Sequence, residues 1–168
     1  ESISSTGFGL HAIHLAGSQN GWERPDENLG QNLILSKRTK LKIRCQKEHI
    51  DLISSSLIDV TLDINGFPLT IKKAKTKKLE KLDTIFSRNI VCSKAETEDE
   101  DLFLERIQKE LDTIEIKITK ALCGMVDQIK TPDGAIHTRS LMIADLSPEN
   151  SIKIQQLGIG SHREMGCG

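Results

Sequence analysis

The sequence contains no tyrosine and few other aromatic residues, with four Phe and one Trp among 168 residues. A tyrosine general acid or base is therefore excluded, and nucleic-acid bases would find few rings for stacking. An excess of one charge sign is also missing, because the formal net charge is −1 at pH 7. The total charge by itself therefore does not indicate a nucleic-acid binder.

Closely spaced cysteines and long apolar runs are missing as well. Cys45, Cys92, Cys123 and Cys167 lie far apart and form no CxxC pair. Without a signal peptide, we expect reduced cysteines and a cytoplasmic location. No apolar run approaches the ~20 residues that span a membrane. The sequence begins at Glu1 rather than Met, so we expect an incomplete N-terminus.

The charges that are present are unevenly distributed. Residues 1–81 hold 13 basic and 9 acidic residues, whereas residues 82–168 hold 10 basic and 15 acidic residues. Six of the basic residues lie within positions 37–47 and six more within positions 72–81. A solvated surface is the usual explanation for one such run, and two runs in the positive half favour a basic binding face.

Local patterns in the first half predict strand, helix, strand, strand. A short strand is expected at 10–16 and a loop at 17–31. In the strand predicted at 39–45, Lys40, Lys42 and Arg44 share one face and apolar residues the other. A helix at 47–57 follows, and then a hairpin within 59–73 that turns at Asn65-Gly66.

The second half predicts strands at 83–93, 114–122 and 135–145, and helices at 98–113 and 148–157. A hairpin turn is expected at Pro132-Asp133-Gly134. Ser147 is placed to cap the start of the last helix and Gly158 its end. After this helix comes the glycine-rich segment GIGSHREMGCG, residues 158–168.

This order of elements predicts an α+β fold of two tandem ferredoxin-like halves, each of βαββαβ (RRM-like) order. The N-terminal half would cover residues 1–81, with its opening strand and helix before Glu1. The C-terminal half would cover residues 82–168 and end in the glycine loop. Its last strand is expected beyond Gly168, so the loop is read as an interior crossover.

The segment LSPENSIKIQQLGIGSHREMGCG (146–168) resembles the C-terminal signature of CRISPR repeat-RNA processing endoribonucleases, the small Cas ribonucleases of the RAMP superfamily. It is similar to members from myxobacterial-type loci, which carry an L-S-x-E-x-S helix and a G-x-G-x-x-R-x-M-G-C-G loop. GLHAIHLAG (9–17) resembles the family's Gly-x-His segment. The matching residues of the C-terminal signature are Leu146, Ser147, Glu149, Ser151, Gly158, Gly160, Arg163, Met165, Gly166, Cys167 and Gly168.

The resemblance implies cleavage of CRISPR precursor RNA within its repeats, without a metal ion. The 2′-OH beside the scissile phosphate attacks it and leaves a 2′,3′-cyclic phosphate and a 5′-OH. Histidine suits both proton transfers because its pKa lies near neutrality. Many members use a Tyr/His or Tyr/His/Lys set, and this chain has no Tyr.

We expect His14 to be the first catalytic candidate and His11 the second. In a strand they would face opposite sides, unless the strand ends between them. The alternative is that each only makes a structural hydrogen bond. His49 and His137 are read as structural or solvated. No metal site is expected, because His11 and His14 form only a lone H-x-x-H.

The expected RNA contacts come from both basic runs and from the glycine loop. Exposed N–H groups of the loop and Arg163 would grip phosphates, or else the loop is simply a helix cap followed by a packed crossover. Such contacts position RNA without reading its sequence. The candidates are Lys37, Arg38, Lys40, Lys42, Arg44, Lys73, Lys75, Lys77, Lys78, Gly158, Gly160, His162 and Arg163.

The expected partners are the CRISPR repeat RNA hairpin and other Cas proteins of a crRNA-guided effector complex, with no membrane and no small-molecule cofactor. Two other functions fit the sequence. One is a non-catalytic RNA-binding subunit of the same superfamily, which the absence of Tyr favours. The other is a ferredoxin-like regulatory module that binds a small metabolite, which the lysine runs disfavour.

Overall fold

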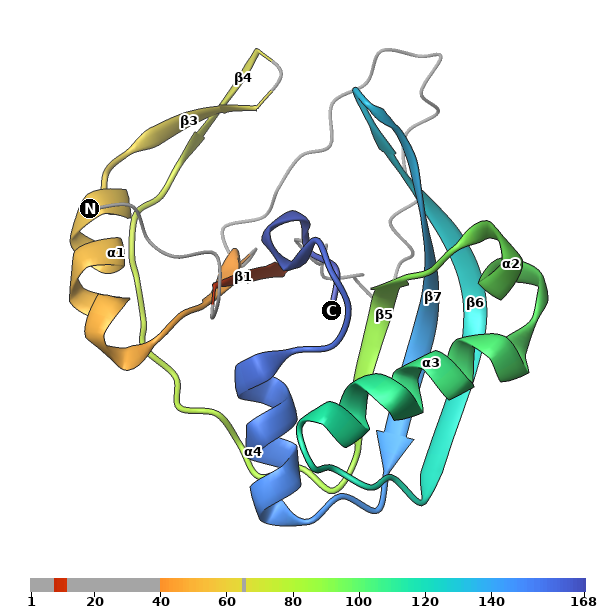
Figure 1. Ribbon diagram of the computed structural model, residues 1–168. Helices are drawn as coiled ribbons and strands as arrows, with labels where there is room; N and C mark the ends of the chain where they lie inside the picture. Colours follow the sequence, from red (N-terminus) through yellow and green to blue (C-terminus); the bar gives the residue numbers. More distant parts are fainter. Residues whose placement is uncertain (1–7, 12–39, 65) are drawn as a thin grey trace, which may run out of the picture.

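The computed structural model describes residues 8–11, 40–64 and 66–168, and Figure 1 shows how their helices and strands are arranged. The predicted α+β class is confirmed, with short antiparallel sheets and helices in both halves of the chain. Within the described residues, no helix is long and apolar enough to cross a membrane.

The C-terminal half is built on a sheet of three strands, β5 (Ile85–Val91), β6 (Lys120–Thr131) and β7 (Gly134–Ala144). The strand order is β5-β7-β6, and both pairings are antiparallel. Therefore β5 and β6 run parallel with β7 between them, which is the split βαβ arrangement of a ferredoxin-like unit.

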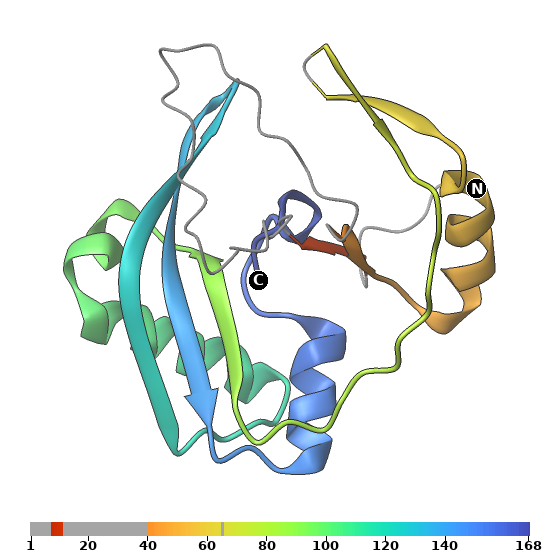
Figure 2. The same cartoon turned by 180° about the vertical axis from the view of Figure 1, so that it is seen from behind.

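The helices of this half are α2 (Lys94–Glu98), α3 (Glu100–Thr113) and α4 (Pro148–Leu157). Figure 1 shows α3 across one face of the sheet, and in Figure 2 the sheet lies in front of that helix. Ser147 caps α4 by accepting the N–H of Asn150, with Pro148 at the first turn. The predicted caps of α4 are confirmed, since the N–H of Gly158 bonds Ile154 at its C-terminus.

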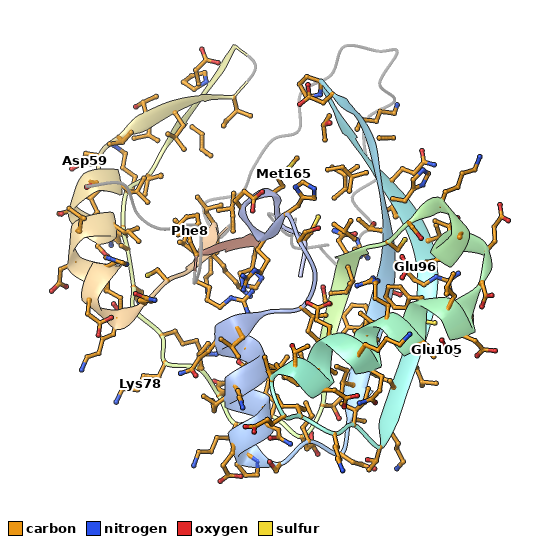
Figure 3. All side chains as sticks on the ribbon, in the orientation of Figure 1. Phe8, Asp59, Lys78, Glu96, Glu105 and Met165 are labelled. Carbon is orange, nitrogen blue, oxygen red and sulfur yellow. The ribbon has the colours of Figure 1, made fainter. Side chains whose placement is uncertain are left out.

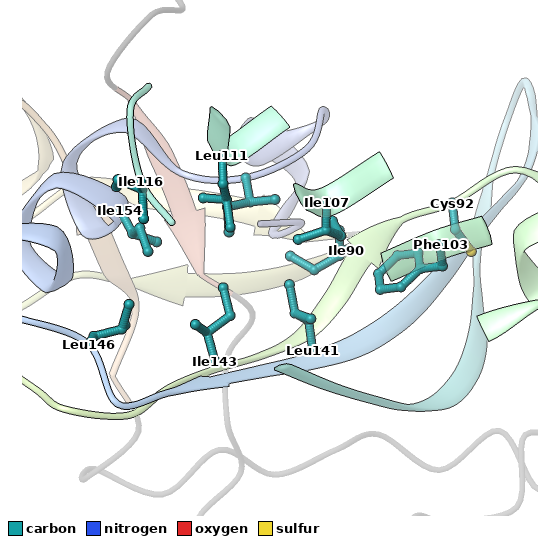
Figure 4. Close-up of a cluster of buried hydrophobic side chains, with 11 residues drawn as sticks. Ile90, Cys92, Phe103, Ile107, Leu111, Ile116, Leu141, Ile143, Leu146 and Ile154 are labelled. Carbon is teal, nitrogen blue, oxygen red and sulfur yellow. The ribbon is translucent and has the colours of Figure 1, made fainter. Parts of the chain in front are cut away.

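The core fills the space between this sheet and the helices α3 and α4 (Figure 4). Phe103, Ile107 and Leu111 come from one side of α3 at helical spacing and are fully buried. They meet Ile90 of β5 and, from β7, Leu141 and Ile143, and the rest of the cluster is Cys92, Ile116, Leu146, Ile154 and Ile159.

The helix predicted over 98–113 forms as α3, but a further short helix, α2, precedes it. Asp99 separates the two, because it adopts an extended conformation and caps α3. The strand predicted at 114–122 is displaced, and β6 begins only at Lys120. Glu115 takes a positive φ of 57°, which no strand permits, and sets the turn that buries Ile116.

The N-terminal half contains two strand pairs among the described residues. β1 (Gly9–His11) pairs with β2 (Lys42–Arg44), and β3 (Thr61–Ile64) pairs with β4 (Phe67–Thr70). Between them lie a 3-10 helix, η2 (Lys47–His49), and α1 (Ile50–Leu57). The predicted hairpin of β3 and β4 is confirmed, whereas the division of the chain near residue 81 stays a prediction.

The two ends of the described chain meet in space. β1 packs against the short 3-10 helix η3 (Arg163–Met165) of the glycine loop. Both ribbon views show the loop beside β1, and Phe8 and Met165 lie at this junction (Figures 1, 2 and 3). The fold therefore brings together the two segments that carry the sequence signature.

Candidate nucleic-acid interface

Arg44 lies at the centre of the junction between β1, β2 and α4. It pairs across the strands with Gly9, which is buried. A Cβ at Gly9 would lie 3.2 Å from the Arg44 guanidinium, so the missing side chain leaves room for that group. Burial and then the charge of Arg163 lower the pKa of Arg44. The guanidinium groups of Arg44 and Arg163 are therefore close enough in this junction to repel each other.

Arg44 also has a structural contact. Its Nη1 donates to the backbone carbonyl of Gln155, 2.5 Å away. That carbonyl lies in the last turn of α4, where carbonyls lack helical partners and the helix dipole is negative. The bond uses one of five N–H donors of a guanidinium. Arg44 is half-buried, and the bond to α4 leaves its other N–H donors available.

Arg163 is the second cation, and glycines surround it. A Cβ at Gly158 would lie 2.6 Å from Arg163 Cδ, and one at Gly168 would lie 3.0 Å from Arg163 Cγ. Both glycines also have positive φ. The glycine pattern of the loop therefore makes space for the arginine side chain. Among the described residues, neither Arg44 nor Arg163 forms an ion pair with a carboxylate.

The N–H groups of the glycine loop are mostly used inside the protein. Gly158 N–H donates to Ile154 O at 2.7 Å, and Gly168 N–H donates to Asn89 O at 2.8 Å. Gly160 N–H donates to the carboxylate of Glu110 at 2.7 Å. These groups are therefore not free to grip a phosphate, and a packed crossover describes this part of the loop. What remains available for binding is side chains, with Arg163 half-buried between the glycines and His162 and Glu164 exposed beside it.

The lysines of the second basic run follow an exposed connection from β4 to β5. Lys73, Lys75 and Lys78 are exposed, and Lys77 is paired with Glu80 at 2.8 Å. The end of this connection is fixed to α4, because Gln155 donates to Glu80 O and Leu82 N–H donates to Ser151 Oγ. The run is therefore held beside the same helix whose C-terminus contacts Arg44.

The first basic run is described in part. Lys40 and Lys42 are exposed, whereas Arg44 turns inward to α4. The three predicted contacts on this strand therefore do not share one environment. Lys37 and Arg38 lie outside the described residues.

The histidines are divided by their surroundings. His11 lies on β1, opposite Lys42, in the strand that packs against η3. His14 lies outside the described residues. His162, at the start of η3, has a φ of 57° and places Nδ1 3.5 Å from Glu164. His137 lies 3.2 Å from Gln128 on the β6–β7 hairpin, and His49 is half-buried in η2.

Sequence reasoning missed two participants in this region. The Gln155 carbonyl accepts from Arg44, and the Glu110 carboxylate accepts from the Gly160 amide, each across segments far apart in the chain. The described residues contain no group of three or more His, Cys, Asp or Glu side chains that could hold a metal ion.

The fold defines the class, since the chain is an α+β protein with a ferredoxin-like unit, which is compatible with the RAMP-type fold. The family model described as Cas6 Crispr matches residues 1–168. The chain therefore belongs to the Cas6 family.

One curated relative is similar over much of the chain. The CRISPR-associated endonuclease Cas6 of Myxococcus xanthus (strain DK1622) is 25% identical over 138 residues. The match covers 82% of this chain and 58% of the relative. The chain thus spans somewhat more than half the length of the curated relative that it matches.

Proposed function

We propose that this chain is an endoribonuclease that cleaves CRISPR precursor RNA within its repeats to produce mature crRNA. Membership of the Cas6 family supports the substrate. The observation that carries the proposal is the junction itself, where the strand of His11 packs against the loop of Arg163, with Arg44 nearby. Cations without a carboxylate partner there suit a phosphate.

The reaction proposed is a transesterification that needs no metal ion. A histidine removes the proton of the 2′-OH, the 2′ oxygen bonds to phosphorus, and the bond from phosphorus to the 5′ oxygen breaks. A proton delivered to that oxygen gives the 5′-OH, and a 2′,3′-cyclic phosphate remains. The candidates for proton transfer are His14 and His11, and Arg163 and Arg44 would stabilise charge on the phosphate oxygens.

The remaining contacts are proposed to hold RNA along its backbone. Arg163 binds a phosphate, Gly158 and Gly160 shape the loop that carries it, and His162 lies at its edge. The other proposed contacts are Lys37, Arg38, Lys40, Lys42, Lys73, Lys75, Lys77 and Lys78. The protein would act in the cytoplasm and stay on the product hairpin with other Cas proteins of an effector complex.

The test uses labelled repeat RNA with EDTA present, and the product ends are analysed. Cleavage that leaves a 2′,3′-cyclic phosphate and a 5′-OH is expected. An uncut repeat, or a cut that requires Mg²⁺, would contradict the proposal. His14→Ala and His11→Ala are assayed separately, and loss of the general acid or base should slow cleavage by ~10²–10⁴-fold. If both variants cut normally, the catalytic assignment is wrong.

A second candidate is a non-catalytic RNA-binding subunit of the same family. The observation that favours it is the absence of tyrosine, which many members use in their active sites. Binding of repeat RNA without any cleavage under the same conditions would select it.

A further inference from the structure

The glycine loop is held to the core by one acidic side chain, that of Glu110. Its Oε1 accepts the N–H of Gly160 at 2.7 Å, across fifty positions of sequence. A hydrogen bond to a carboxylate is stronger than one between neutral groups. The other described hydrogen bonds from amides of this loop go to backbone carbonyls. A substitution at Glu110 can therefore remove this hydrogen bond without changing the sequence of the loop itself.

The other carboxylate oxygen of Glu110 has a partner on its own helix, where both side chains are half-buried. This oxygen, Oε2, lies 3.4 Å from Nη1 of Arg106. Arg106 in turn bonds Glu96 at 2.5 Å and the carbonyl of Val91 at 2.8 Å, and it lies over the ring of buried Phe103. Each carboxylate oxygen of Glu110 thus has its own partner, and only one of these partners belongs to the loop.

The anchored residue, Gly160, contacts a side chain of α3 and lies beside β5, an edge strand of the sheet. Gly160 has a φ of +79°, and a Cβ there would lie 3.4 Å from Ile90 Cγ2 of β5. Gly160 also separates Gly158, which makes room for the arginine side chain, from Arg163 itself. The position of the backbone at Gly160 therefore influences where the side chain of Arg163 lies.

We propose that Glu110 is a positioning residue that holds the glycine loop in the conformation that presents Arg163 to RNA. The inference rests on the proposed function, because it takes Arg163 as an RNA contact. Glu110 itself does not touch RNA and acts through the Gly160 amide. An acidic residue would otherwise be unfavourable so near a surface that binds phosphates.

The experiment compares Glu110→Ala and Glu110→Gln in the full chain. Glutamine keeps an oxygen that can accept the Gly160 N–H, whereas alanine does not. Glu105→Ala is the matched control, since Glu105 is an exposed residue of the same helix (Figure 3). Arg163→Ala serves as the separate test of the proposed RNA contact.

Two quantities are measured for each variant. Hydrogen–deuterium exchange of the loop peptides without RNA reports local opening, and peptides of β7 report global stability. For Glu110→Ala we expect the Gly160 amide to exchange roughly 10- to 100-fold faster, with β7 much less affected. Affinity for labelled repeat RNA should fall several-fold, in proportion to the lost population of the binding conformation. Glu110→Gln should restore most of both, and Glu105→Ala should leave both unchanged.

Unchanged loop exchange in Glu110→Ala would overturn the inference. The inference would also be overturned if Glu110→Ala showed faster loop exchange but bound RNA with full affinity while Arg163→Ala lost affinity. In that case the proposed function would stand. If Arg163→Ala itself binds RNA like the wild type, the RNA role proposed for the loop is wrong, and the positioning role of Glu110 falls with it.

Discussion

Gly158→Ala is predicted to disturb the loop in two ways at once. Gly158 has a φ of 72° and a ψ of 175°, a region that is essentially restricted to glycine. Forcing alanine into it costs about 1–3 kcal/mol. The new Cβ would also lie 2.6 Å from Arg163 Cδ and 2.8 Å from its Nη1, so the arginine side chain must move.

The expected loss can be expressed as a melting temperature. For a domain of 150–250 residues, 1 kcal/mol corresponds to about 2–4 °C. The backbone contribution alone therefore lowers the melting temperature by about 2–12 °C, and the contact with Arg163 adds to it. If Arg163 contacts a phosphate, its displacement should weaken RNA binding by about 10- to 100-fold, as expected for a lost hydrogen bond to a charged group.

Gly66→Ala is the matched control. Gly66 also has a positive φ, +86°, but no atom lies within 4 Å of a Cβ built there. Its substitution costs about 1–2 kcal/mol of backbone strain without a clash, in the β3–β4 hairpin, which Figure 1 shows apart from the glycine loop. The melting temperature should therefore fall in both variants, whereas the affinity for RNA should fall only in Gly158→Ala.

A double-mutant cycle isolates the contact. In Gly158→Ala with Arg163→Ala, the clash is gone and only the backbone cost remains, so the two effects on stability should not be additive. A coupling of about 0.5–3 kcal/mol is typical of residues in contact. Additive losses, or equal behaviour of Gly158→Ala and Gly66→Ala in melting and in RNA binding, would refute the reasoning.

Arg163→Ala should reduce the slope of log affinity against log salt concentration by about 0.7–0.9, the contribution of one phosphate contact, whereas alanine at exposed Lys117 should leave the slope unchanged. A salt titration of repeat-RNA binding measures both slopes, and equal slopes would contradict the assignment. A separate prediction concerns Glu96: burial raises its pKa, but the hydrogen bonds from Ser93 and Arg106 outweigh burial and leave the pKa below its usual 4.5. A lowered folded-state pKa gives stability that is present above about 4.5 and is lost as the pH falls through the folded-state pKa. Urea unfolding at pH 7 and pH 3 should therefore show a larger loss for the wild type than for Glu96→Gln, and equal losses would mean that this carboxylate is not responsible.

Elements with complete local signals were predictable from the sequence. Asn65-Gly66 and Pro132-Asp133-Gly134 mark the turns of hairpins that form at those positions. Ser147 and Gly158 mark the ends of α4. In each case the deciding interactions lie within a few residues of each other, so the local pattern contains the needed information.

Elements whose ends depend on tertiary packing were not predictable in the same way. The alternation of 114–118 favours a strand, but Ile116 is buried in the core by a turn at Glu115 instead. The Ser93–Glu96 capping box is a local signal for the start of α2, and the break before α3 is marked by Asp99, whose side chain accepts the N–H of Leu102. A helical pattern alone continues through Asp99, and only its extended conformation ends the first helix.

The arginine contacts show why a site is harder to predict than a fold. Glu110 and Gln155 are polar residues of ordinary helices, and their partners lie 50 and 111 positions away. No periodicity connects such residues, because loop closure through the folded core brings them together. The sequence signature located the glycine loop, and the packing determined which of its groups are left to bind.

Four arginines, two beside the core and two at the junction, differ in their partners. Arg106 and Arg139 each meet a carboxylate and the ring of Phe103, so their charges are neutralised within the fold. Arg44 and Arg163 have no ion-pair partner among the described residues, and the charge of Arg163 adds to burial in lowering the pKa of Arg44. Two neighbouring cations repel each other, so this arrangement works against stability in the free protein. An anion bound between them would turn the repulsion into attraction, which is why this junction, rather than the paired arginines on the core, is the place to look for RNA phosphate.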